Sequence, residues 1–118
     1  MDAALKALAE PRRREILRIV WSEELPAARI AARFDDVTRS AISQHLGVLR
    51  EAELVLDRRD GTRHLYRANH ARMAELRRFL DEFWTDSLDR LQRLAESDQR
   101  DLDRQREADQ QRKGTTDD

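Results

Sequence analysis

Residues 38–67 constrain the fold of this chain more than any other part of the sequence. Thr38 is a favourable helix N-cap, because its side-chain oxygen can accept a hydrogen bond from a free amide of the first turn. Three apolar residues then recur at the i, i+4, i+7 spacing of one buried helix face: Ile42, Leu46 and Leu49. The segment therefore predicts a helix over residues 38–52, followed by a β-hairpin over residues 54–67.

The opposite face of this predicted helix lacks the charged side chains that exposed helices usually carry, although 40% of the chain is charged. Its members are small or uncharged: Ser40, Ser43, Gln44 and Gly47. Ser and Gln can donate to and accept from base edges, and Arg39 in the first turn could reach a guanine or a phosphate. Such a face favours a helix that enters a DNA major groove. The alternative is a plain amphipathic helix with a bland exterior.

The predicted hairpin is basic around its turn. Asp60-Gly61 is the preferred centre of a two-residue type I′ turn, and that register places Arg58 opposite Arg63. Like charges that face each other destabilise a hairpin slightly, so contact with DNA phosphates would explain why both are present. The alternative is a solubilising edge hairpin whose arginines deter aggregation.

Three strings in this chain resemble the ArsR/SmtB family of winged-helix transcriptional repressors. They are AEPRRREIL, SAISQHLGVLREAELV and RRDGTRHLYR, in the family's order and spacing. The resemblance extends from Leu5 to about Leu94. It implies a mainly α fold with one β-hairpin, in which a winged helix-turn-helix is followed by a long C-terminal dimerisation helix.

The resemblance also implies which residues meet double-stranded DNA. On the recognition helix these are Arg39, Ser40, Ser43 and Gln44, with His45 flanking them. On the wing they are Arg58, Arg59, Thr62 and Arg63.

Glu53 departs from the family pattern, which usually has glycine at the corner after the recognition helix. Such a corner tends to need a positive φ, which costs a non-glycine residue about 1 kcal/mol. We therefore expect replacement of Glu53 by glycine to stabilise the protein modestly. Gly47 is a second departure, since the family often has a basic residue there.

The flanking segments complete a helical domain. Residues 2–9 predict a first helix, Pro11 is suited to the first turn of a second, and Pro26 opens a third that reaches Phe34. The link over residues 35–37 is short, so the third and fourth helices should form a helix-turn-helix pair.

Asn69 can cap a long final helix with a continuous apolar seam. A single small domain does not need so long a seam, although packing within its own core is the alternative. By the family resemblance, this helix and the first one form the interface of a homodimer. The residues expected at that interface are Leu5, Leu8, Met73, Leu76, Leu80, Phe83, Trp84, Leu88 and Leu91.

The composition changes near residue 95. Residues 1–95 contain 18 Lys and Arg against 16 Asp and Glu, a net charge of +2, whereas residues 96–118 contain 5 against 8, a net charge of −3. We expect residues 1–95 to form the winged helix-turn-helix dimerising domain. Residues 96–118 should form a charged tail that is either a helical extension or disordered.

Several classes of protein are not expected. The chain has no cysteine, which excludes disulfides and thiolate metal sites, and its three histidines lie on different predicted elements, so no metal site or other cofactor is expected. Motifs for nucleophilic catalysis or phosphate binding are missing, which argues against an enzyme. With no membrane-length apolar run and no signal-peptide pattern, a cytoplasmic protein is expected.

Together these features predict a homodimeric, sequence-specific DNA-binding repressor. Each recognition helix would read half of an inverted-repeat operator, and the bound dimer would block polymerase. Release would depend on a small-molecule or protein inducer, or on concentration. The alternative is a winged-helix protein-interaction module without strong DNA affinity, which the net charge of −1 favours.

Overall fold

A computed structural model describes residues 1–115 of the chain, and their side chains through residue 112. The chain divides into two compact units, of which the first is Met1–Phe79 and the second begins at Leu80. In the described part, no helix combines the length and the apolar character needed to cross a membrane.

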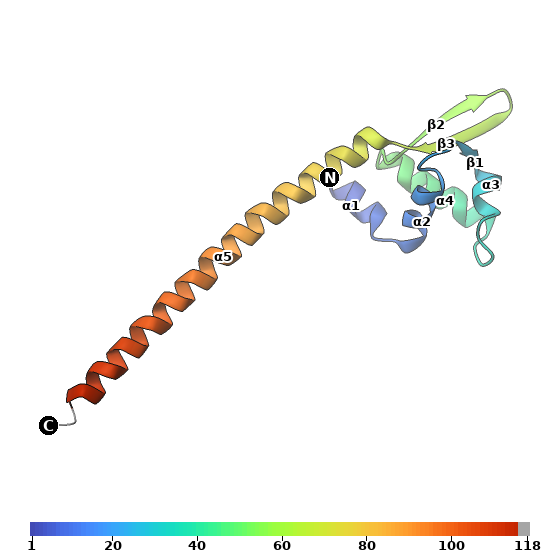
Figure 1. Cartoon of the computed structure of the whole chain (residues 1–118). Coiled ribbons are helices and arrows are strands. Elements are labelled where there is room, and N and C mark those ends of the chain that lie inside the picture. The colour runs from blue at the N-terminus through green and yellow to red at the C-terminus, as the bar shows by residue number, and fades with distance from the viewer. Residues whose placement is uncertain (116–118) are drawn as a thin grey trace. The chain divides into compact units, whose positions relative to one another are not determined.

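The first unit combines short helices with a small antiparallel sheet, and the second unit consists of the continuation of the last helix. The elements are α1 (Asp2–Leu8), α2 (Pro11–Ile19), β1 (Leu25–Pro26), α3 (Ala27–Ala31), α4 (Arg39–Glu51), β2 (Val55–Asp60), β3 (Arg63–Ala68) and α5 (His70–Thr115). Figure 1 shows the β2–β3 hairpin projecting from the helices of the first unit, with β1 beside β3. The predicted mainly α fold with a β-hairpin is confirmed.

The predicted helix over residues 38–52 is α4. The amide of Ala41 donates to Thr38 Oγ1 over 3.1 Å, so Thr38 is the N-cap. Its predicted buried face is 0–1% exposed and packs in the core of the first unit. The largest fully buried side chains of that core are Ile16, Val20, Ile30, Ile42, Leu46, Leu49, Leu54 and Val55.

The segment after α2 differs from the prediction. Leu25 and Pro26 form a third strand that pairs with Tyr66 and Leu65 of β3. Proline cannot donate a backbone hydrogen bond and is therefore confined to edge strands such as this one. The predicted third helix is present as α3, with Pro26 as its N-cap residue, but the prediction that it reaches Phe34 was wrong, because α3 ends at Ala31 and i→i+3 hydrogen bonds follow it.

The register of the hairpin also differs from the prediction. Asp60 pairs with Arg63, and Arg58 faces Leu65, so the turn consists of Gly61 and Thr62. Gly61 has φ +63°, and neither Asp60 nor Thr62 has a positive φ. A positive φ at the first turn position alone is the pattern of a type II′ turn. The predicted repulsion across the hairpin is therefore absent, and an oppositely charged pair closes the turn.

The corner at Glu53 has the predicted conformation. Glu53 has φ +63° and is the one non-glycine residue with positive φ in the described part. The amides of Glu53 and Leu54 donate to the carbonyls of Arg50 and Leu49, over 3.0 and 2.9 Å. These two bonds form a Schellman motif, which favours glycine at the position of Glu53. The expectation of a left-handed corner is confirmed.

Asn69 fastens this corner to the start of α5. Its Nδ2 donates to the carbonyl oxygen of Glu53 over 2.9 Å, and its Oδ1 accepts from the amide of Arg72 over 3.2 Å. The predicted cap is therefore confirmed, and the same side chain also holds the end of the α4 corner.

Substitution of Glu53 should measure the strain of this corner. Glu53→Gly is expected to be more stable than Glu53→Ala by about 1 kcal/mol, because alanine keeps the positive-φ penalty and glycine does not. Both variants lose the 3.9 Å contact between the Glu53 carboxylate and Arg72 Nε, so their difference isolates the backbone. Urea unfolding monitored by circular dichroism gives the two free energies. Equal stability of the variants would contradict the assigned strain.

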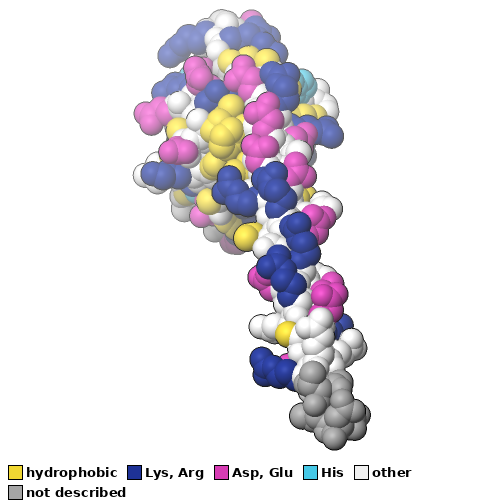
Figure 2. All heavy atoms as spheres, turned by 90° about the vertical axis from the view of Figure 1, so that its left-hand side faces the viewer, with side chains coloured by type: hydrophobic (Ala, Val, Ile, Leu, Met, Phe, Trp, Pro, Cys, Tyr) yellow, Lys and Arg dark blue, Asp and Glu magenta, His cyan; other side chains and the backbone are white. Residues whose placement is uncertain are grey.

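The second unit is a helix with large apolar side chains in solvent. Six of them are 48–62% exposed: Phe83, Trp84, Leu88, Leu91, Leu94 and Leu102. On the face of α5 that Figure 2 shows, basic and acidic side chains outnumber hydrophobic ones. Residues 96–115 continue α5 as a helix, and the expected tail beyond residue 115 lies outside the described residues.

Candidate nucleic-acid interface

The outer face of α4 consists of exposed polar side chains. Arg39, Ser40, Ser43 and Gln44 are all exposed. Within the described part of the chain, none of these four side chains forms a hydrogen bond or an ion pair. Their donors and acceptors are therefore available to a partner outside the molecule, without a bond to break first.

Gly47 lies on the same face of α4 and contributes no side chain to it. A Cβ added at Gly47 would have no heavy atom of the described chain within 4 Å. Glycine costs about 1 kcal/mol relative to alanine inside a helix, and packing within the chain does not account for that cost. The position leaves room for another molecule to approach the backbone of α4.

His45 does not share this face. It is half-buried, and its Nδ1 lies 3.5 Å from Nη1 of Arg13 in α2. The Nε of Arg13 also donates to the carbonyl oxygen of Ala7 over 2.6 Å. His45 thus joins α4 to α2, because its position along the helix turns it toward the other helices.

The tip of the wing carries free positive charge. Arg59, Thr62 and Arg63 are exposed. Of the ion pairs between described residues, none includes Arg59 or Arg63. Two cations beside a narrow turn can approach phosphates that a helix in the groove leaves uncovered.

Arg58 differs from its neighbours at the tip. Its Nε and Nη2 donate to the two carboxylate oxygens of Glu24, over 2.8 and 2.7 Å. These hydrogen bonds lower the pKa of Glu24 below its ordinary value of 4.5, so the carboxylate stays ionised at neutral pH. The Arg58 side chain predicted for DNA contact is therefore already paired with an acid.

Asp57 connects α4 to the wing. His64 Nε2 lies 2.6 Å from Asp57 Oδ2, and Arg50 Nη1 donates to the same oxygen over 3.4 Å. Tyr66 extends the group through a 3.3 Å contact between its hydroxyl and His64 Nδ1. The hydrogen bond with His64, and then that with Arg50, lower the pKa of Asp57 below its ordinary value of 3.8. The ionised carboxylate holds the last turn of α4 beside β2 and β3.

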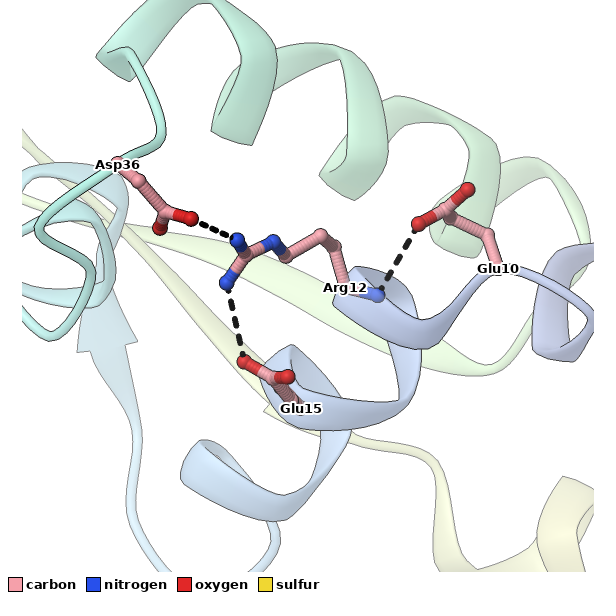
Figure 3. Close-up of polar contacts among 4 residues, drawn as sticks. All are labelled: Glu10, Arg12, Glu15 and Asp36. Atoms are coloured by element: carbon pink, nitrogen blue, oxygen red, sulfur yellow. Dashed lines mark hydrogen bonds and ion pairs between the residues drawn. The ribbon is translucent and has the colours of Figure 1, made fainter.

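Arg12 holds the link that precedes α4, as Figure 3 shows. Its guanidinium is paired with Asp36 in that link and with Glu15 one turn along α2. It also lies over the ring of Phe34, with its carbon 5.5 Å from the ring centroid. Sequence reasoning missed this role, for which the run of three arginines at the start of α2 was the available signal.

The basic character is concentrated in the first unit. Met1–Phe79 contains 16 Lys and Arg against 12 Asp and Glu, a net charge of +4, although the whole chain has −1. Among the residues that the structure describes, no three His, Cys, Asp or Glu side chains gather as metal ligands would.

Known proteins share this arrangement. A family model described as a helix-turn-helix domain matches residues 8–58. The HTH-type transcriptional regulator Rv2034 of Mycobacterium tuberculosis is 41% identical over 97 residues, which are 82% of this chain and 90% of that protein. The chain belongs to the ArsR family of winged helix-turn-helix transcriptional regulators.

Two further similar proteins are described as a repressor and as a homodimeric DNA-binding domain. The transcriptional repressor SdpR of Bacillus subtilis is 35% identical over 58% of this chain and 76% of its own length. A winged helix-turn-helix DNA-binding domain of Mycobacterium bovis, solved in solution and described as homodimeric, has 30% identity and a TM-score of 0.57. That match covers 69% of this chain and 78% of the other.

The residues expected at an ArsR-family dimer interface differ in exposure. Leu76 is 2% exposed, so it already belongs to the core of its own chain. Leu5, Leu8, Met73 and Leu80 are half-buried. Leu8 and Met73 line a groove of about 480 Å³ in the first unit. Among the expected interface residues, the most exposed are Phe83, Trp84, Leu88 and Leu91.

Proposed function

We propose that this chain is a sequence-specific DNA-binding transcriptional repressor that acts as a homodimer. The observation that carries the proposal is the exposed and unpaired face of α4, with Arg39 at its start and no carboxylate among its members. The names of relatives support it, since SdpR and the arsenical resistance proteins of staphylococci are repressors.

Each part of the interface has a distinct role in this proposal. The face of α4, comprising Arg39, Ser40, Ser43 and Gln44, enters the major groove and reads base edges. Arg59, Thr62 and Arg63 at the wing tip hold flanking phosphates, which adds affinity without reading sequence. His45 supports α4 from behind through Arg13.

In the proposed homodimer, the partner subunit contributes a second copy of α4. The exposed apolar residues of α5 give each chain a surface that water disfavours, and the solved relative from Mycobacterium bovis is described as homodimeric. Two copies of α4 related by a two-fold axis would read an inverted repeat, with half-sites about one helical turn apart or a multiple of it. Residues 1–95 would act as the dimerising domain and residues 96–118 as its charged tail.

Binding to duplex DNA at several salt concentrations tests the proposal. Binding through several phosphates should weaken steeply as salt rises, because each contact releases counterions. A protein-interaction module, which the paired Arg58 and the net charge of −1 would suit, should show little affinity even at low salt.

Two arginine substitutions distinguish recognition of the base sequence from binding to phosphates. Arg39→Ala should cost about 1–3 kcal/mol on the operator and much less on random duplex, because a guanine contact is lost. Arg59→Ala should weaken both duplexes alike and reduce the salt slope by about 1. Operator and random duplex can be compared by fluorescence anisotropy. Equal losses on both duplexes for Arg39→Ala would remove its reading role.

A further inference from the structure

One basic side chain of the wing is paired across the sheet. Glu24 precedes β1, and Arg58 lies in β2, with β3 between the two strands. Both guanidinium–carboxylate distances are below 3 Å, at 2.8 and 2.7 Å. Two parallel hydrogen bonds are the strongest arrangement of arginine with a carboxylate.

The pair changes what the wing offers to DNA. Arg58 and Glu24 together carry no net charge, whereas neither Arg59 nor Arg63 lies within ion-pair distance of an acidic side chain in the described part of the chain. A phosphate that approaches Arg58 must displace a carboxylate of the same charge or share the guanidinium with it. The tip of the wing, with Arg59, Asp60 and Arg63, therefore keeps a net charge of +1, and the pair of Arg58 with Glu24 adds none.

We propose that Glu24 limits the affinity of this protein for DNA by occupying Arg58 and so withholding one phosphate contact. The inference rests on the proposed DNA binding. Because phosphate contacts carry no sequence information, the restraint acts on operator and random duplex alike. Glu24 thus lowers the affinity for non-operator DNA, and the residues of α4 that read bases are unchanged.

Glu24→Gln tests this inference directly. Glutamine keeps the size and polarity of the side chain but removes the charge, so Arg58 becomes available to a phosphate. On random duplex the variant should bind roughly three- to tenfold more tightly at low salt, and the slope of log affinity against log salt should steepen by about 0.9. The melting temperature shows whether the fold is retained.

Glu23→Gln is the matched control. It makes the same change in net charge one residue away, and the Glu23 carboxylate lies 3.9 Å from Arg33, outside the wing. We expect a much smaller gain in affinity than for Glu24→Gln at the same salt concentration, because Glu23 lies near Arg33 and occupies no basic side chain of the wing. A gain equal to that of Glu24→Gln would overturn the inference, since overall charge would then explain both.

Arg58→Ala, alone and combined with Glu24→Gln, completes a double-mutant cycle. In the wild-type background it should weaken binding, because the Glu24 carboxylate is left unpaired beside the wing, and in the Glu24→Gln background it should return the affinity to about the wild-type level. If Glu24→Gln weakens DNA binding or leaves it unchanged while the wild type binds, Glu24 does not restrain Arg58 and the inference alone fails. If neither protein binds duplex DNA at low salt, the proposed function fails and the inference fails with it.

Discussion

Replacing Leu88 and Leu91 together by glutamate should convert the proposed dimer into monomers. The two side chains are 56% and 62% exposed in the single chain, so a partner can still bury about half of each. At roughly 1 kcal/mol for each half-buried leucine, the four leucines of a dimer contribute about 4 kcal/mol. The dissociation constant should therefore rise about a thousandfold. Sedimentation velocity over a concentration series measures it.

Loss of the dimer should also weaken operator binding. Linked half-sites raise the effective concentration of the second recognition helix to the millimolar range, so monomers should bind an inverted repeat at least about a hundredfold less tightly. Leu102→Glu is the matched control, because it makes the same change outside the expected interface and should leave the dimer intact. A Leu88→Glu, Leu91→Glu protein that still sediments as a dimer would show that α5 does not join the protomers through these residues.

Gln44→Glu should strongly weaken DNA binding while leaving the fold intact. Gln44 is exposed on α4 and has no partner in the described chain, so the new carboxylate stays solvated in the free protein. In the major groove it would lie among phosphates, and juxtaposed like charges at an interface cost several kcal/mol. We expect a loss of at least about a hundredfold in affinity for any duplex, with an unchanged melting temperature.

Gln105→Glu is the corresponding control for Gln44→Glu. It makes the same chemical change on an exposed position of α5 and should alter DNA affinity by less than about twofold. Retention of full affinity by the Gln44→Glu protein would exclude α4 as the helix that enters the groove.

Local patterns predicted α4 and its corner correctly. Thr38, the apolar spacing of residues 42–49 and the corner at Glu53 depend on neighbours within a few residues of each other. Such features follow from helix geometry and capping, which are properties of short segments. The exposure of Arg39, Ser43 and Gln44 could therefore be predicted from the sequence, whereas the contact of His45 with Arg13 of α2 could not.

Longer-range features could not be predicted in this way. Asp60-Gly61 and Gly61-Thr62 are both acceptable turn centres, and the two registers differ by two residues, which leaves every side chain on the same face. The observed register instead places buried Val55 opposite buried Ala68, a match made by tertiary packing. The strand β1 has only two residues, which is too short for an alternating pattern in the sequence. The ion pair of Glu24 with Arg58 depends on that strand, so it could not be predicted either.

The two hydrogen bonds of Asn69 have a mechanical consequence. One carboxamide bonds the backbone at the corner behind α4 and also the first turn of α5, so neither segment can shift without stretching or breaking a bond to the other. A displacement imposed on the start of α5 is therefore transmitted to the end of α4 through Asn69, and also through the contact of Arg72 with Glu53. The first turn of α5 and the last turn of α4 are therefore mechanically coupled.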